Sequence, residues 1–361
     1  MRARMNVYLT TGKKNYKYAY VAIKSLFEKN QNSELYLYIV SEDLEDSDLI
    51  YENELARQYG HHIMILRFDE EAAGRHIWFG PNDHWAVGAM SSYWMFHELL
   101  PSEVDRIIAI ESDTVIVGDL LEIYGTDFEG AYVVCPEPKH KPKNHRDFMQ
   151  KIGGECLTFV LSMYNVEQIR KDFTLEDILN TDAAIRKKAG NSMMELTFGL
   201  LFAGKIKYVP AETACIDENE RYMEELGYDY IAACEKTAKI VHFSSYGDYS
   251  KPWNPVFLVP GYSVWWQYAV DSPYYKEYIE RQWQFYNNTR KRQQEIAKNI
   301  SYRNILLCAM VVMTLFLMTL CLVVRSDWMG CLAVPLVAGV SLGLSVLFRK
   351  ITIEIGKAKN R

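Results

Sequence analysis

The sequence predicts an α/β fold with a mostly parallel sheet, followed by two helices of transmembrane length. Two observations support this fold class. Short β-branched apolar runs alternate with helical patterns over the first two thirds of the chain, which is typical of parallel strands joined by crossover helices. Near the end of the chain, two apolar runs of about twenty residues follow each other, and each is long enough to cross a bilayer.

The predicted elements begin almost at the first residue. Strands are expected at residues 5–10, 35–40 and 63–66, and helices at residues 18–29 and 44–59. Ligands in open sheets of this kind bind beyond the carboxyl ends of the strands. The loop that follows the first strand, residues 10–16, therefore lies at the binding edge of the predicted sheet.

Further elements are predicted between residues 91 and 146, and one of these strands precedes the most informative motif of the chain. A helix at residues 91–99 precedes a strand that starts at Arg106 and runs through the β-branched stretch 107–110. Another strand is expected at 131–135. The segment 135–146 is rich in proline and basic residues, which predicts a long surface loop that is either an acceptor-side lid or a solvated excursion.

Two carboxylates follow the strand that begins at Arg106. Glu111 and Asp113 are two residues apart, so the strand period places them on the same side, with Ser112 on the other. A hard cation such as Mn²⁺ or Mg²⁺ prefers oxygen ligands and would bridge them to a diphosphate. Taken alone, the same triplet also fits a solvated strand end.

A later segment adds two side chains of suitable chemistry. His242 follows a short apolar strand, and Lys251 precedes Pro252 and Trp253. Histidine joins carboxylates as a ligand of Mn²⁺, and a lysine ammonium interacts with phosphate as a point charge. A histidine after a strand also occurs in purely structural roles.

The apolar runs at residues 305–324 and 328–348 predict a transmembrane hairpin. The alternative, two buried core helices, needs a large domain around them. Basic residues flank both ends of the hairpin, so the positive-inside rule places both ends in the cytoplasm. No signal peptide is visible, and the N-terminal part is expected to remain cytosolic.

Charge and cysteine content narrow the function classes. From Arg290 onward there are eleven Lys or Arg and three acidic residues, which gives this segment a net charge of +8. The whole chain has a net charge of −6, so the first 289 residues have a net charge of −14. An acidic body argues against a nucleic-acid partner. The seven cysteines form no C-x-x-C pair, which suits structural thiols in a reducing compartment.

These motifs together resemble glycosyltransferase family 8, the family of glycogenin and the bacterial lipooligosaccharide galactosyltransferases. The resemblance covers roughly residues 5–255. It rests on Asn15-Tyr16 and Ile23-Lys-Ser25, on Glu111-Ser-Asp113 with the following Gly118-Asp-Leu, and on His242 and Lys251-Pro-Trp253. It implies a GT-A fold, a nucleotide-sugar donor that is usually UDP-linked, Mn²⁺ or Mg²⁺, and transfer with retention.

The resemblance also implies roles for single residues. Glu111, Asp113 and His242 match the metal ligands, with Glu in place of the usual first Asp. The expected donor-binding residues are Thr10, Thr11, Tyr16, Ser112, Gly247 and Lys251.

Several positions depart from the family pattern. The Asp expected before Asn15 is absent, Met95 stands where an arginine is usual, and residues 158–160 replace the Asn-Ala-Gly segment. The Asp-Gln-Asp segment at the reaction centre aligns with Met194-Glu195-Leu196. Glu195 is the candidate catalytic residue, as a stabiliser of an oxocarbenium-like transition state or as a nucleophile. The alternative is an ordinary helix residue.

The predicted organisation is a GT-A domain at 1–275, a basic juxtamembrane helix at 276–304, a hairpin at 305–348 and a basic tail at 349–361. The predicted function is a metal-dependent glycosyltransferase at the cytoplasmic face of the inner membrane. Its partners would be a nucleotide-sugar and a lipid-linked or envelope glycan acceptor. A noncatalytic membrane scaffold of the same fold is the alternative, and two spans without internal charge disfavour a transporter.

Overall fold

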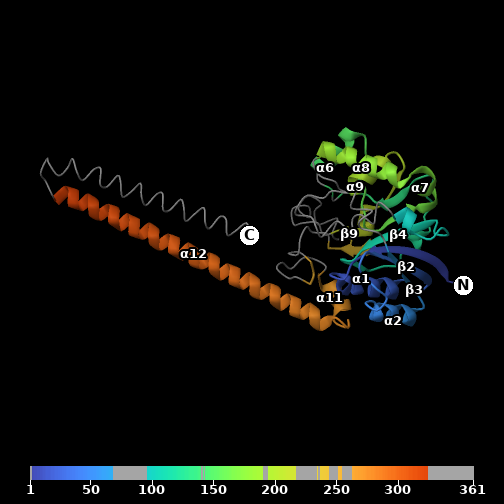
Figure 1. The fold of residues 1–361 in the computed structure, drawn as a ribbon, viewed down its shortest axis with the longest axis horizontal. Coiled ribbons are helices and arrows are strands. Elements are labelled where there is room, and N and C mark those ends of the chain that lie inside the picture. Colours follow the sequence, from blue (N-terminus) through green and yellow to red (C-terminus); the bar gives the residue numbers. More distant parts are fainter. Residues whose placement is uncertain are drawn as a thin grey trace. The chain divides into compact units, whose positions relative to one another are not determined.

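The computed structural model describes residues 2–67, 96–139, 141, 143–189, 194–216, 234, 236–243, 251–253 and 262–323. The chain divides into two compact units, Met1–Gln282 and Trp283–Arg361. The first unit contains all the described strands, and the second contains most of the long helix α12 (Figure 1).

The main sheet has seven strands in the order β3-β2-β1-β4-β7-β6-β8. Their bounds are β1 Ala3–Thr10, β2 Ser33–Ser41, β3 His62–Arg67, β4 Arg106–Glu111, β6 Val133–Pro136, β7 Ser162–Asn165 and β8 Ile206–Val209. The strands β3, β2, β1 and β4 are parallel, and β7 is antiparallel to both of its neighbours. The carboxyl ends of β1, β2, β4 and β6 therefore meet at one edge, as the sequence predicts for the first three of them.

A second sheet joins distant parts of the chain. It consists of β5 Thr114–Ile116, β10 Ile240–His242 and β9 Ala214–Ile216, with β10 in the middle. The pairing of β10 with β5 is antiparallel. Because β5 begins directly after the end of β4, this pairing brings residue 242 back to the carboxyl edge of the main sheet.

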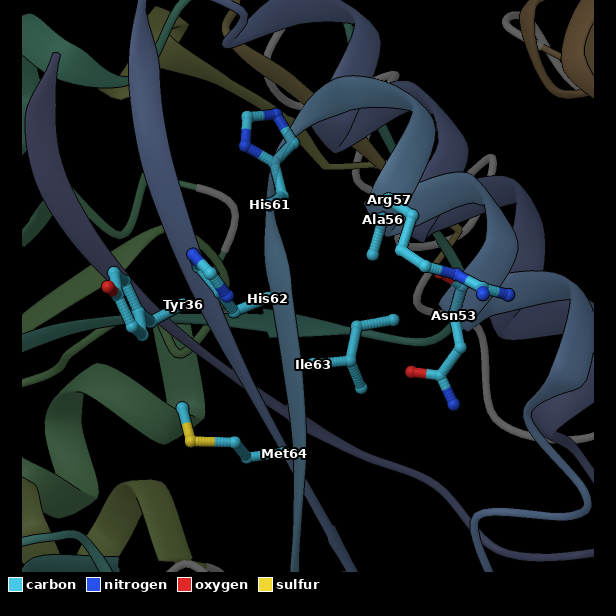
Figure 2. Close-up of a pocket in the computed structure, with 8 residues that line it drawn as sticks. All are labelled: Tyr36, Asn53, Ala56, Arg57, His61, His62, Ile63 and Met64. Atoms are coloured by element: carbon cyan, nitrogen blue, oxygen red, sulfur yellow. The ribbon is translucent and has the colours of Figure 1, made fainter.

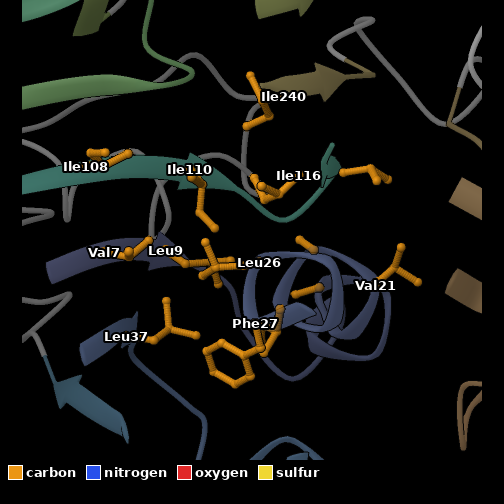
Figure 3. Close-up of a cluster of buried hydrophobic side chains, with 14 of the residues drawn as sticks. Val7, Leu9, Val21, Leu26, Phe27, Leu37, Ile108, Ile110, Ile116 and Ile240 are labelled. Atoms are coloured by element: carbon orange, nitrogen blue, oxygen red, sulfur yellow. The ribbon is translucent and has the colours of Figure 1, made fainter. Parts of the chain in front are cut away.

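The described helices are α1 Tyr16–Lys29, α2 Ile50–Tyr59, α5 Leu121–Tyr124, α6 Lys143–Ile152, α7 Val166–Asp172, α8 Leu175–Ala189, α9 Met194–Leu201, α11 Tyr262–Ala269 and α12 Tyr275–Val323. Helix α1 covers one face of the main sheet. Figure 3 shows Leu26 and Phe27 of α1 against Leu9 of β1 and Leu37 of β2. All four side chains are fully buried, and burial of each such side chain contributes about 1.5–3 kcal/mol.

Two buried polar residues of α1 fix the segment that follows β4. Ser25 Oγ accepts a hydrogen bond from the Ile116 amide at 2.9 Å, and Asn30 Oδ1 accepts one from the Leu120 amide at 2.8 Å. Both side chains are fully buried. Because buried amides need partners, these two bonds hold β5 and the start of α5 against α1.

The structure corrects two predicted elements. The helix expected from residue 44 begins at Ile50, because a turn comes first, in which the Glu45 amide donates to Asp48 Oδ2 at 2.9 Å. The surface loop expected at 135–146 ends at Lys143, where α6 begins. The apolar residues Phe148, Met149 and Ile152 of this helix pack near Ile185 and Leu196.

Within the described residues, one helical stretch, Tyr275–Phe316, is long and apolar enough to cross a membrane, by length and composition. The predicted run 305–324 falls largely on α12. The second run, 328–348, and the tail lie outside the described residues. The structure thus supports one candidate span, and the hairpin, its orientation and the domain bounds remain predictions.

Candidate metal and donor site

The carboxylate motif lies in a tight turn between β4 and β5. Thr114 Oγ1 donates to the Glu111 carbonyl at 2.7 Å and closes this turn. The register of β1 and β4 pairs Thr10 with Glu111. The end of the first strand and the carboxylate motif therefore lie side by side at the carboxyl edge.

His242, at the end of strand β10, lies beside the same turn. The register pairs His242 with Thr114, and the Phe243 amide donates to the Asp113 carbonyl at 3.0 Å. Two backbone contacts thus fix the histidine beside residues that lie about 130 positions earlier in the chain.

The three side chains form a compact cluster of ligand atoms. Glu111, Asp113 and His242 each offer one atom, and these atoms lie within 4.8 Å of one another. His242 Nε2 is 2.7 Å from Glu111 Oε2 and 3.3 Å from Asp113 Oδ1. Among the described residues, neither nitrogen of this buried imidazole has a well-directed hydrogen bond. Two carboxylates and an imidazole whose ligand atoms converge in this way fit the ligand preferences of a divalent cation such as Mn²⁺.

Lys251 completes the charge pattern of the cluster. Its ammonium pairs with Asp113 Oδ2 and donates to the Phe243 carbonyl at 2.6 Å. Burial raises the pKa of Asp113, but Lys251 and His242 outweigh burial and hold this pKa well below its usual range. Burial lowers the pKa of His242, and the Asp113 and Glu111 carboxylates outweigh that effect and raise it to about 9. Lys251 is thus the cationic partner of Asp113 beside the three ligand atoms.

The loop after β1 borders this cluster. Thr10 and Thr11 are buried, and Thr11 Oγ1 has no hydrogen-bond partner among the described residues. The amide of Tyr16 donates to the Gly12 carbonyl at 3.0 Å, which turns the chain into α1. Ser112 is half-buried in the β4–β5 turn, and Gly247 lies outside the described residues.

Asp43 is a candidate site residue that was not predicted from the sequence. Its Oδ1 accepts hydrogen bonds from the Lys13 amide at 2.9 Å and from Ser41 Oγ at 3.1 Å. An exposed carboxylate from the end of β2 therefore lies on the loop from which the expected Asp is absent. Only the knowledge that β1 and β2 are neighbours could have revealed it.

Glu195 lies in the first turn of α9 and pairs with Lys141. The Lys141 ammonium donates to both Glu195 carboxylate oxygens at 2.8 Å, and the two side chains are 6% and 17% exposed. Among the described residues, Glu195 is not part of the ligand cluster of Glu111, Asp113 and His242.

A cavity of about 420 Å³ lies elsewhere, between α2 and the edge strand β3. Figure 2 shows Asn53, Ala56 and Arg57 on the helix side and His61 to Met64 on the strand side, with Tyr36 of β2. It contains none of the predicted site residues. The carboxylate cluster, rather than this cavity, is the candidate functional site.

Sequence comparison gives one match. The profile of glycosyl transferase family 8 matches residues 6–256, which is more than two thirds of the chain. No curated protein sequence matches the chain significantly.

Several solved glycosyltransferase structures are similar. The galactosyltransferase LgtC, solved with donor and acceptor sugar analogs, has a TM-score of 0.60 at 14% identity, over 74% of this chain and 96% of LgtC. The bifunctional glycosyltransferase WbbM has a TM-score of 0.63 at 15% identity, over 78% of this chain and 52% of WbbM. GlyE of Streptococcus pneumoniae TIGR4 has a TM-score of 0.52 at 14% identity, over 80% of this chain and 65% of GlyE. At these identities the likeness establishes the GT-A-like fold.

Proposed function

The chain belongs to glycosyltransferase family 8 and is a glycosyltransferase, and on this premise we propose that it moves a sugar from a UDP-linked donor to an acceptor at a membrane. The observation that carries the proposal is the cluster of Glu111, Asp113 and His242, with Lys251 bound to Asp113. This arrangement offers a place for both a cation and a phosphate group.

In this proposal Glu111, Asp113 and His242 hold a divalent cation, Mn²⁺ or Mg²⁺. The cation would neutralise the negative charge that develops on the departing diphosphate. The extra methylene of Glu111, relative to the usual Asp, is accommodated because Glu111 is the most exposed of the three side chains, at 32%.

Lys251 has capacity for a phosphate oxygen. A lysine ammonium has three N–H donors. Two of them are directed to Asp113 and to the Phe243 carbonyl. The third N–H and the positive charge would bind the donor diphosphate, beside Thr10 and Thr11 of the adjacent loop and Ser112 of the turn.

Glu195 is the proposed catalytic carboxylate in a reaction that retains the anomeric configuration. Its role would be to stabilise an oxocarbenium-like transition state or to attack the anomeric carbon. Both roles require a carboxylate, and the Lys141 ammonium at 2.8 Å balances the charge of this one.

The acceptor is proposed to be a lipid-linked or envelope glycan at the cytoplasmic face of the inner membrane. The candidate membrane-spanning stretch of α12 motivates this assignment. Basic residues of α12, at Arg290, Lys291, Arg292, Lys298 and Arg303, add favourable charge for anionic lipid headgroups.

A transfer assay tests the proposal. Full-length protein in detergent is incubated with Mn²⁺, a panel of UDP-sugars and bacterial membrane lipids, and UDP release is measured. We expect Lys251→Met to lower the rate at least tenfold, whereas Lys239→Met, which removes a lysine only weakly paired with the exposed Glu122, leaves it unchanged. Equal rates for the two variants would contradict the assigned role of Lys251.

A further inference from the structure

A segment outside the family match packs against both sides of the proposed donor site. The match ends at residue 256, whereas α11 and the first turns of α12 extend over residues 262–282. These turns belong to the same compact unit as the sheet. Their contacts reach the backbone beside Lys251 and the start of α1.

The first set of contacts fixes the chain next to Lys251. Trp266 Nε1 donates to the Pro252 carbonyl at 3.1 Å. The ring of Trp253 stacks on Tyr18 of α1, with centroids 4.3 Å apart, and meets Trp265 of α11 at 5.7 Å. Trp253 is 7% exposed and Trp265 is fully buried. Lys251 is therefore attached to a backbone that α1 and α11 hold from both sides.

The second set of contacts fixes the loop that carries Tyr16. The ring of Tyr274, just before α12, meets Tyr16 edge-on at 5.9 Å. In the first turn of α12, the Tyr278 hydroxyl donates to the Lys17 carbonyl, and Glu277 pairs with the Lys17 ammonium. The last residue of the predicted donor loop therefore rests on residues that the family match does not include.

One residue connects the two sets. The Tyr278 ring lies 5.1 Å from Trp265 and 5.7 Å from Tyr18, and its hydroxyl also accepts a hydrogen bond from Ser272 at 3.2 Å. The aromatic cluster is thus continuous from α12 to Trp253. Aromatic pairs at these separations contribute beyond simple area burial.

We infer that α11 and the first turns of α12 are a positioning element of the donor site, which holds Lys251 and Tyr16 in place before the donor binds. A lysine on a loosely held backbone would lose more conformational entropy on binding phosphate, so this support strengthens binding. The identity of the ligand rests on the proposed function. The inference assigns a role in the unit Met1–Gln282 to the first turns of the helix that also carries the candidate membrane span.

Conservative variants of the full-length chain test this inference. Trp266→Phe removes the hydrogen bond to Pro252 and keeps an aromatic ring, although a smaller one. Tyr278→Phe removes the hydrogen bond to Lys17 and keeps the same ring. The matched controls are Trp283→Phe and Tyr286→Phe, because these side chains are 61% and 54% exposed and contact each other instead. Melting temperatures are recorded for all variants.

The first readout needs no nucleotide. Lys251 is acylated with an N-hydroxysuccinimide ester, and its rate of modification is followed by mass spectrometry. We expect about fivefold faster modification in Trp266→Phe, the factor that one ordinary hydrogen bond is worth, and an unchanged rate in Trp283→Phe. Equal rates in both variants would overturn the inference for Lys251.

The second readout is the dissociation constant of UDP with Mn²⁺, measured well below the melting temperature. Trp266→Phe and Tyr278→Phe are each expected to weaken binding about fivefold, whereas a purely structural role would lower the melting temperature and leave binding unchanged. If the wild type binds no UDP, the proposed donor is wrong, and the rate of Lys251 modification still decides the inference.

Discussion

Lys141 donates hydrogen bonds of 2.8 Å to both carboxylate oxygens of Glu195. The pair joins the end of the segment after β6 to the first turn of α9. Both side chains are largely buried, so each charge depends on the other for compensation. Two separate expectations arise, one for stability and one for catalysis.

For stability, Lys141→Met is expected to lower the free energy of unfolding by about 3 kcal/mol, because it leaves the buried Glu195 carboxylate without a partner. Urea denaturation measures this loss. Lys171→Met, which breaks an exposed pair with Glu167, should cost less than about 1 kcal/mol. The double variant Lys141→Met, Glu195→Leu should recover part of the loss, and a double variant less stable than Lys141→Met would contradict the pairing argument.

For catalysis, Glu195→Gln is expected to lower turnover at least a hundredfold while UDP binding stays within a factor of two. The amide has nearly the same shape but lacks the negative charge that the proposed transition state requires. Steady-state rates and calorimetric UDP binding are measured on the same preparation. Full turnover by Glu195→Gln would make Glu195 an ordinary helix residue.

A buried acid makes stability depend on pH. Glu52 is fully buried, with the Tyr274 hydroxyl 3.5 Å from Oε2, and burial raises its pKa to about 7. The folded state binds this proton more tightly than the unfolded state, so the stabilisation is complete below about pH 4.5 and is lost as the pH rises through about 7. The difference between a pKa of 4.5 and one of about 7 corresponds to about 3 kcal/mol in the free energy of unfolding. Denaturation at several pH values should show this decline, and Glu52→Gln should flatten it; an equal decline in Glu52→Gln would assign it to other groups.

Arg170 is expected to be a major stabilising residue. Its guanidinium donates to five backbone carbonyls, at distances of 2.6–3.3 Å, and these belong to His97, Leu100, Pro101, Ser102 and Val104. Arg170→Met should cost about 3 kcal/mol or more, because several carbonyls lose a charged donor. Arg170→Lys should recover only part of this, since a lysine lacks the planar fork. Thermal unfolding compares both with the exposed control Arg57→Met, and equal melting temperatures for the three would contradict the assignment.

Local patterns were sufficient to predict the strands at the binding edge. The run from Ile107 to Ile110 is β-branched and apolar and forms β4, buried as expected. The turn at Asp48 and the helix that begins at Lys143 were missed, since turn bonds and an apolar stripe in a polar segment give weak local signals. The Lys141–Glu195 pair and the contact of Asp43 with Lys13 were missed for another reason. Each joins residues that are far apart in the sequence, and local patterns do not show which strands and loops become neighbours in the fold.

Contacts at the site between residues far apart in the sequence also could not be predicted. The family resemblance selected His242, but only the pairing of β10 with β5 accounts for its place beside Asp113. The contacts of Trp265 with Trp253 and of Tyr278 with Lys17 are made by helices beyond the region of resemblance, and no motif indicated them.

The most direct test of the account is a calorimetric titration of UDP into detergent-purified full-length protein, with and without Mn²⁺. The account predicts Mn²⁺-dependent binding that is lost in Glu111→Ala and Asp113→Ala and retained in Glu122→Ala, whose side chain is 87% exposed. Binding of equal strength without Mn²⁺, or in the Asp113→Ala variant, would contradict the proposed metal and donor site.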